Sequence, residues 1–366
     1  MAILSYSVGF GASYATTLAD VQSVSINLGR QWIVDGYSAG TAQITSRNIS
    51  AWTTAPQVGD QIRISASGTI VFGGRITDVE IFYGNLTSMD YAVITCESFL
   101  SLMGRRNLVS LSLAQGLTST QITTVINTAY STMSTAIQAG SSTAVAQTYT
   151  GNALEALNTL AITEVGRFAE TFISTTEGLR FMGRGDFNPT APTIALSDAD
   201  TSLIQYEQIN FRSTTENYYT RVTINPLTVA SQTNNNGSAP YFTLELSTYD
   251  YNTLQADSLS QYYLNQFSSK TATPTSFVSS YSQQTTAAAQ TAFLNAIGFG
   301  SIIGAKASQV FRGTTYNTII EGLTINADIG DGDTRVEWYC SSQDLNAYLI
   351  LNDAIYGKLN QNRLGF

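Results

Sequence analysis

The sequence predicts a mainly β fold with an inserted α/β domain, and three changes of pattern along the chain support this. The first hundred residues place apolar side chains at every second position, as in Val24, Ile26 and Leu28, which is typical of half-buried strands. The next hundred carry two apolar stripes at helical spacing, and alternation then returns. The predicted domains are 1–100, 101–200 and 201–366, the last with a helix-containing insertion at about 250–308.

A predicted hairpin in residues 58–80 organises the first domain. Apolar and polar side chains alternate up to a turn at Gly68, which can adopt a positive φ. The pair Gly73-Gly74 in the returning strand predicts a bulge or a backbone that a neighbour approaches closely. The apolar period then slips, which one inserted residue near Asp78 would explain. We therefore expect a bent hairpin of the kind that a small barrel or sandwich needs.

Two helices and a hairpin are expected in the second domain. Thr118 and Gln121 match a capping box at a helix start. Apolar residues continue this helix at Ile122, Val125, Ile126, Ala129, Met133 and Ile137. A second helix begins at Asn152 and ends at Gly166, where a glycine C-cap is expected. Residues 167–184 then predict a strand hairpin.

The third domain mixes strands with helix signals. Residues 231–239 (SQTNNNGSA) predict a polar loop, and a turn is expected at 330–333. The predicted strands are 218–225, 316–329 and 334–340, and the predicted helices are 253–267 and, more weakly, 283–294.

Charge is sparse along the whole chain. Charged residues make up 12% of the 366 residues, against roughly 25% in typical soluble domains. Two explanations are open: a surface that is buried against neighbouring subunits, or compositional drift in the source organism. The net charge is −9 and basic residues do not cluster beyond Arg105-Arg106. This argues against a clamp that grips nucleic-acid phosphates, but it is compatible with a pore through which nucleic acid slides.

No catalytic, cofactor-binding or metal-binding residue is identified. The chain has no histidine, which removes the commonest general base and most zinc sites. Two groups of acidic residues suggest turns and not calcium loops, because their spacing does not fit an EF-hand. These groups are Asp328, Asp331 and Asp333, and separately Asp198 and Asp200.

Several other motifs are interpreted as structural. The glycines at 298, 300 and 304 do not match a dinucleotide fingerprint, and Lys306 lacks the preceding glycine of a phosphate loop. The chain's three tryptophans, Trp32, Trp52 and Trp338, could stack on sugars, but such aromatics more often fill β-cores and subunit contacts. The two cysteines, Cys96 and Cys340, are expected to be buried and unpaired.

No membrane anchor is expected. The N-terminal residues lack the basic and apolar parts of a signal peptide, and the longest apolar stretch, residues 292–305, is too short to span a bilayer. The expectation is a protein made and folded in a cytoplasm.

Several segments together resemble the minor tail or baseplate-hub proteins of bacteriophages. Residues 30–45 (RQWIVDGYSAGTAQIT) are similar to the N-terminal entry of that family, and residues 56–78 to the hairpin that follows. Residues 153–184 resemble its middle domain and residues 345–366 its closing segment, whereas 248–308 match poorly outside their helix.

The resemblance implies a structural hub subunit and no enzyme. In such hubs the first and last β-regions each look like a copy of the tail-tube barrel, so that a homotrimer imitates the six-fold tube. The implied partners are a distal-tail or tube ring, a central fibre or spike, the tape measure, and genomic DNA passing through the lumen without specific binding. The implied location is the tail tip of a virion assembled in the host bacterial cytoplasm. Alternatives are a distal-tail or tube-like ring subunit, a carbohydrate-binding β-module and, least favoured, a peptidoglycan hydrolase.

Overall fold

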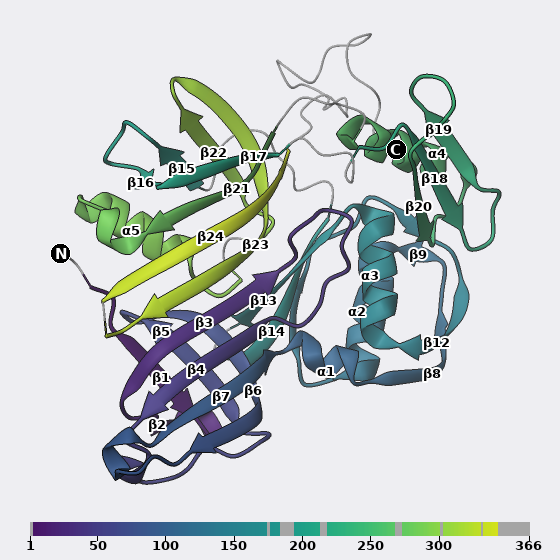
Figure 1. Ribbon diagram of the computed structural model, residues 1–366. Coiled ribbons are helices and arrows are strands. Elements are labelled where there is room, and N and C mark those ends of the chain that lie inside the picture. Colours follow the sequence, from purple (N-terminus) through teal and green to yellow (C-terminus); the bar gives the residue numbers. More distant parts are fainter. Residues whose placement is uncertain are drawn as a thin grey trace.

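One large β-sheet runs through the molecule and links the first and last parts of the chain (Figure 1). The computed structural model describes residues 3–173, 176–183, 194–212, 218–267, 273–300, 303–330 and 332–342. The first β-region consists of β1 (Tyr6–Phe10), β2 (Thr16–Thr17), β3 (Val21–Gly29), β4 (Thr41–Arg47), β5 (Gln61–Ala66), β6 (Thr69–Phe82) and β7 (Tyr91–Ser98). Its strands alternate buried and exposed side chains as the sequence predicts.

The last β-region adds strands to the same sheet. They are β15 (Ile194–Ser197), β16 (Ile204–Gln205), β17 (Gln208–Arg212), β21 (Thr273–Ser280), β22 (Lys306–Phe311), β23 (Thr314–Asp328) and β24 (Asp333–Ser342). Short 3-10 helices lie at Ala12–Tyr14, Ile49–Ala51, Thr87–Met89 and Tyr281–Gln283. The helix α5 (Ala287–Ala296) forms from the weaker of the two helix signals in this part of the chain.

Neither β-region closes into a barrel, so that part of the predicted fold class is wrong. A closed first barrel would need β3 to pair with β1. Instead β3 pairs with β4 on one edge and with β23 on the other, with Ile26 opposite Ile325. Because a strand has only two edges, the pairing with β23 excludes closure and fuses the two regions into one sheet.

The hairpin of β5 and β6 has the predicted bend, and its details are confirmed. Gly68 has a φ of 88° in the turn, and the pairing of β6 with β7 shifts register between Ile76 and Asp78. A Cβ added at Gly74 would lie 2.0 Å from the carbonyl oxygen of Glu97, which confirms the close approach. The second register shift, opposite Ile64 and Ser65, lies outside the glycine pair.

The middle region is built from three helices and short sheets. Its elements are α1 (Leu100–Gly104), β8 (Asn107–Leu113), β9 (Gly116–Leu117), α2 (Thr118–Ala129), β10 (Ser134–Ile137), β11 (Thr143–Ala144), β12 (Gln147–Asn152), α3 (Ala153–Glu164), β13 (Arg167–Ile173) and β14 (Thr176–Met182). β10 runs parallel to β14 and extends the β13–β14 hairpin to three strands.

Two helix ends in this region differ from the prediction. Thr118 does not cap α2, because its hydroxyl donates to the carboxylate of Glu164 instead. α2 also ends at Ala129, short of the predicted stripe. Asn152 does cap α3 by accepting from the Leu154 N–H. At the other end, Val165 and not Gly166 takes the left-handed conformation. Gly166 has a different role, because a Cβ at this position would clash with the Phe181 ring.

A smaller unit is inserted between β17 and β21. It contains β18 (Arg221–Pro226), β19 (Gln232–Asn235), β20 (Thr243–Thr248) and α4 (Thr253–Phe267), whose bounds match the predicted helix. The predicted polar loop at 231–239 is partly wrong, because its first half forms β19 against β18. α4 packs on β18 and β19 around a core of its own that includes Val222, Leu259 and Phe267.

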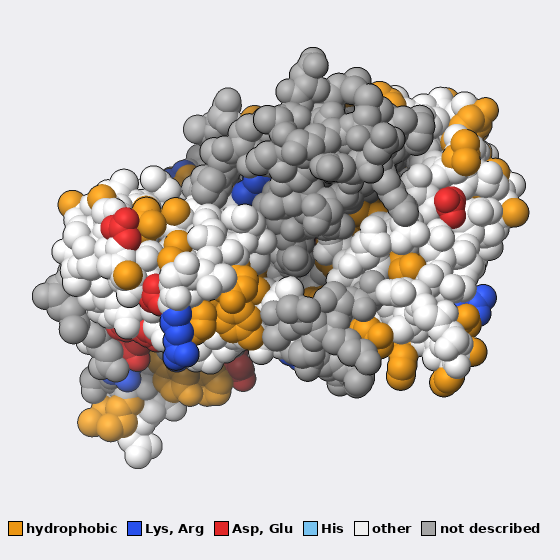
Figure 2. Space-filling model, turned by 90° about the horizontal axis from the view of Figure 1, so that it is seen from above, with side chains coloured by type: hydrophobic (Ala, Val, Ile, Leu, Met, Phe, Trp, Pro, Cys, Tyr) orange, Lys and Arg blue, Asp and Glu red, His pale blue; other side chains and the backbone are white. Residues whose placement is uncertain are grey.

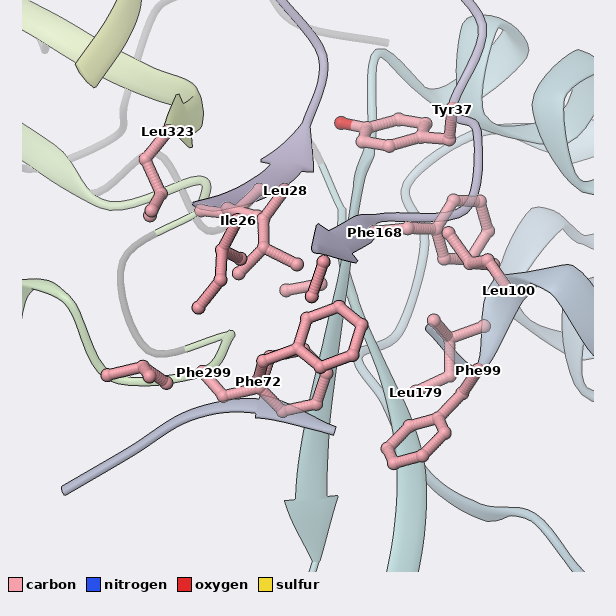
Figure 3. Close-up of a cluster of buried hydrophobic side chains, with 14 of the residues drawn as sticks. Ile26, Leu28, Tyr37, Phe72, Phe99, Leu100, Phe168, Leu179, Phe299 and Leu323 are labelled. Carbon is pink, nitrogen blue, oxygen red and sulfur yellow. The ribbon is translucent and has the colours of Figure 1, made fainter. Parts of the chain in front are cut away.

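The main hydrophobic core draws on all three parts of the chain. Figure 3 shows Ile26 near Leu323 and Phe72 near Phe299, which joins the first β-region to the last. Phe168 of the middle region packs against Tyr37 in the same core. A single shared core of this kind fixes the three parts relative to one another.

Candidate functional site

A buried ion-pair network joins the first β-region, the middle hairpin and the last β-region. Glu321 lies at a bulge in β23, where the pairing with β24 shifts register. Its carboxylate accepts hydrogen bonds from Arg30 Nε at 2.9 Å and from Arg167 Nη2 and Nε at 2.6 and 3.0 Å. The Ser341 hydroxyl donates a fourth bond at 2.6 Å. Each region thus contributes at least one member.

The network is ionised and dry. The side chains of Arg167 and Glu321 have no exposed surface, and that of Arg30 is 5% exposed. Burial by itself would raise the pKa of Glu321, but the two guanidiniums and the hydrogen bonds outweigh it and lower this pKa to about 2. The ring of Tyr37 lies 4.5 Å from the Arg30 guanidinium and covers it. A carboxylate held in its charged form is suited to fastening segments and not to proton transfer.

Two more carboxylates fasten the middle region to the first β-region. Glu170 on β13 accepts from the Ser98 hydroxyl at 2.8 Å and from the Leu100 N–H at 2.5 Å. Burial raises the pKa of Glu170 to about 7 despite these bonds. Glu177 on β14 pairs with Arg75 and also accepts from Gln61 at 3.2 Å.

These residues were missed by sequence reasoning. Their partners lie up to 291 positions away, as with Arg30 and Glu321, and no local spacing connects them. The one signal available was a charge embedded in an apolar strand, as in the stretch IIEGL around Glu321. Such a charge must be paired where it is buried.

A second candidate functional feature is a strip of eight antiparallel strands within the large sheet. Its order is β6–β7–β4–β3–β23–β24–β21–β17, and Figure 1 shows much of it lying side by side. Hydroxyl and amide groups bridge the seam where β3 meets β23. Ser25 donates to Asn326 at 2.8 Å, and Thr324 donates to Asn27 at 2.7 Å. The outward face at this seam is therefore a ladder of uncharged polar groups.

Carboxylates outnumber arginines on this outward face. The paired registers place Asp78, Glu80, Glu97, Asp328, Asp333 and Glu337 on it, together with Arg47, Arg75, Arg212 and Arg335. Arg75 is already paired with Glu177. None of the described residues on these strands is a lysine. Figure 2 shows the molecule from above, and charged side chains are sparse on that face as well.

Both ends of the strip have a free edge in the described part of the chain. Residues 208–211 of β17 pair with β21 alone, and β6 has no partner opposite β7 beyond Ile76. Free strand edges carry unpaired N–H and C=O groups that can pair with another chain.

Acidic side chains of the two predicted turns accept hydrogen bonds from backbone N–H groups. Asp328 Oδ1 accepts from the Gly330 N–H at 3.0 Å, and Asp200 Oδ1 accepts from the N–H and hydroxyl of Ser202. Asp198 accepts from the Arg312 N–H at 2.7 Å, and Asp331 lies outside the described residues. Both sites therefore act as turns.

Several other residues singled out by the sequence are packed in the interior. Cys96 and Cys340 are buried and free, as predicted. Trp338 is fully buried against Phe277, with ring centroids 5.0 Å apart. The backbone of Gly300 passes so close to Glu170 that a Cβ would meet its carbonyl oxygen at 1.9 Å.

Within the described ranges, no group of three or more acidic or cysteine side chains could hold a metal ion. No helix among these residues combines the length and apolar character needed to cross a bilayer.

Comparison with known proteins gives a consistent fold. No protein-family model matches the sequence, and no curated protein matches it. A tail protein from Neisseria meningitidis superposes with a TM-score of 0.67 at 11% identity, covering 93% of this chain and 97% of that one. The 43 kDa tail protein of prophage MuSo2 from Shewanella oneidensis gives 0.61 at 11% identity, covering 93% and 100%.

A third similar structure comes from a secretion machine. It is an E. coli component of the type VI secretion system, described as similar to bacteriophage T4 tail proteins, with a TM-score of 0.52 at 11% identity and coverage of 89% of this chain and 74% of that one. At these identities the likeness concerns the fold. The chain therefore has the fold of phage tail proteins over nearly its whole length.

Proposed function

We propose that this chain is a structural subunit of a phage-tail hub, three copies of which form a ring at the tail tip. The observation that carries the proposal is the eight-stranded strip, in which the first and last β-regions stand side by side in one sheet. Three copies bring together six such regions, which matches the six-fold tube that the sequence resemblance implies. The likeness to tail proteins over 93% of the chain supports a virion role.

The strip suits closure into a ring by strand pairing. Its eight strands alternate in direction, so β6 and β17 run in opposite directions. The free edge of β17 in one copy can therefore pair with β6 of the next and continue the antiparallel order. A contact between two different edges is heterologous, and it ends in a closed ring when the rotation between copies allows it.

In this proposal the domains 1–100 and 201–366 form the ring wall, and the domain 101–200 braces them from the side. The buried network of Arg30, Arg167 and Glu321 fastens the three parts so that load on the ring does not separate them. The ring would join the tube to a central fibre or spike and let the tape measure and DNA pass. Assembly in the host cytoplasm and a place at the tail tip follow from this role.

The outward face of the strip would line the channel. Carboxylates outnumber arginines there, and the seam carries uncharged groups such as Ser25 and Asn27. A wall of this kind repels phosphates weakly and does not hold them. We expect a channel wall that is net acidic or neutral, through which DNA slides.

Native mass spectrometry of the purified chain, with electron microscopy of the same sample, tests the proposal. We expect three copies per particle and a central opening lined by the strip. A chain that stays monomeric in solution and also within tail particles would contradict the ring. An opening lined by arginines, with the acids outside, would contradict the slippery channel.

Two other functions give different outcomes in the same tests. A distal-tail or tube-like ring subunit would give six copies per ring instead of three. A carbohydrate-binding module would bind glycans on an array as an isolated chain. The burial of Trp338 removes one of the aromatic residues on which that alternative depends.

A further inference from the structure

The tip of the β6–β7 hairpin exposes a dense group of large apolar side chains. Within residues 81–91, which we call the hairpin tip, Tyr83 is 77% exposed, Leu86 61% and Met89 59%. Ile81 and Tyr91 are also exposed, at 38% and 37%. Scattered apolar residues are normal on a surface, but a contiguous group at one projecting point marks an interaction site.

The tip is a built loop. The Asp90 side chain accepts from the Gly84 N–H at 2.8 Å, and the Met89 N–H donates to the Leu86 carbonyl at 2.8 Å. Gly84 lies so close to Met89 that a Cβ there would meet the Met89 Cβ at 2.5 Å. The rings of Phe82 and Tyr91 stack at its base with centroids 4.6 Å apart. The backbone that carries the apolar side chains is thus held in one conformation before any partner binds, which lowers the entropic cost of binding.

Acidic side chains outnumber basic ones at the end of the strip where the tip lies. Glu80 immediately precedes Ile81 and lies on the outward face of β6. Arg47 pairs opposite Tyr91, and its N–H donates to the Asp20 carbonyl. The pair Asp328–Asp333 lies at the same end of the sheet, on β23 and β24 beyond β4 and β3. A lipid surface with anionic headgroups is a poor partner for such a rim. An apolar pocket with a basic rim is a good one.

We infer that the hairpin tip docks this chain end-on into apolar, basic-rimmed pockets of a ring made of a different tail protein. The inference rests on the proposed ring. In a ring closed head to tail, all copies point their tips to the same end, so that the tips form an apolar crown around the channel mouth. A second copy stacked through this end would bring acidic rims together, which disfavours the chain itself as the occupant.

Photo-crosslinking within assembled particles identifies the occupant. Tyr83 is replaced by p-benzoylphenylalanine, with the same replacement at Val109, which is 81% exposed on β8, as the matched control. We expect the analogue at position 83 to join this chain to a different protein of the tail. A crosslink to a second copy, or equally poor crosslinking from both positions, would overturn the inference.

A triple variant, Tyr83→Ser with Leu86→Ser and Met89→Ser, tests the energetics. Each anchor side chain at an interface contributes roughly a tenfold gain in binding affinity. The yield of particles that carry this chain should therefore fall by about 100-fold or more in the triple variant. Val109→Ser should leave this yield unchanged. Native mass spectrometry should show that the triple variant still forms the trimer. A triple variant with the particle yield of the wild type would contradict the docking role. Binding of the wild-type chain to vesicles of phosphatidylglycerol would also contradict it.

The two proposals fail separately. A triple variant with a wild-type trimer and full particle yield refutes the docking inference alone. A wild-type chain without a trimer refutes the proposed ring, whatever the crosslink at Tyr83 reports.

Discussion

Glu321 on β23 and Arg167 on β13, 154 positions apart in the chain, form two hydrogen bonds in a place without water access. Arg30 binds the other oxygen of the same carboxylate. The three charged side chains therefore fasten together the first β-region, the middle region and the last β-region, which are far apart in the sequence. Replacing one member leaves the others buried and charged, which is far more costly than losing an exposed pair.

The first prediction follows from this network. Glu321→Gln leaves two buried guanidiniums without their counter-charge and should lower the free energy of unfolding by about 3–5 kcal/mol. Glu97→Gln breaks the exposed pair with Arg105 and is the matched control, with an expected loss below about 1 kcal/mol. Urea unfolding followed by tryptophan fluorescence measures both. Equal losses for the two variants would contradict the role given to the network.

The second prediction concerns Glu170 and pH. Its pKa is raised to about 7 in the fold, above its ordinary value of 4.5, so the folded state binds a proton that the unfolded state has released. Its contribution to stability is therefore full below about pH 4.5 and is lost as pH rises to about 7. Because the chain has no histidine, few other groups titrate in this window.

Thermal unfolding between pH 4.5 and 7.5 tests this behaviour. The melting temperature of the wild type should fall across this window, and Glu170→Gln should flatten the fall. Glu321 has the opposite sign: its pKa of about 2 means that stability is lost as pH falls below about 4.5. An unchanged slope in Glu170→Gln would show that another group carries the effect.

The third prediction compares three glycines. In Gly74→Val the new Cβ meets backbone at 2.0 Å, and in Gly73→Val it meets the Phe172 ring at 2.5 Å. Backbone yields less than a side chain, so Gly74→Val should abolish soluble, assembled protein and Gly73→Val should reduce it. Gly116→Val meets nothing within 4 Å and serves as the control. Size-exclusion chromatography of the three variants checks the order, and normal assembly by both hairpin variants would make the glycine pair incidental.

The fourth prediction concerns the proposed channel wall. Gln43→Arg with Thr45→Arg adds positive charge to the outward face of β4. Binding to a DNA fragment should appear at low salt and weaken steeply as salt rises, because bound phosphates release counterions. Fluorescence anisotropy at two salt concentrations measures this, with Val109→Arg as a control away from the face. Tight, salt-sensitive binding by the wild type would contradict the slippery wall.

Local patterns predicted what local physics controls. Alternation gave the strands, the slip near Asp78 gave the bulge beside β7, and helical spacing gave the bounds of α4. Thr118 shows where this fails. A capping box depends on the competing partners of the hydroxyl, and the carboxylate of Glu164 is 46 positions away. Propensity cannot rank a local acceptor against a distant one.

Long-range pairing accounts for the remaining errors. Two barrels were the natural expectation for two β-regions, but closure depends on which strand takes the free edge of β3. That strand is β23, and nothing in the alternation of either strand selects the other. The network of Arg30, Arg167 and Glu321 escaped for the same reason, since its members become neighbours only after the sheet has formed.

The pairing of β3 with β23 also sets an order of events during synthesis. Ser25 and Asn326 are 301 positions apart, so at about 5–20 residues per second a ribosome needs roughly 15–60 s to supply the partner of β3. Until then, β3 has an uncovered edge on the nascent chain. A chain that stops before β23 keeps that edge and is exposed to aggregation and proteolysis, whereas a chain that includes β23 covers it. The fold thereby makes synthesis through β23 a condition for covering this edge of β3.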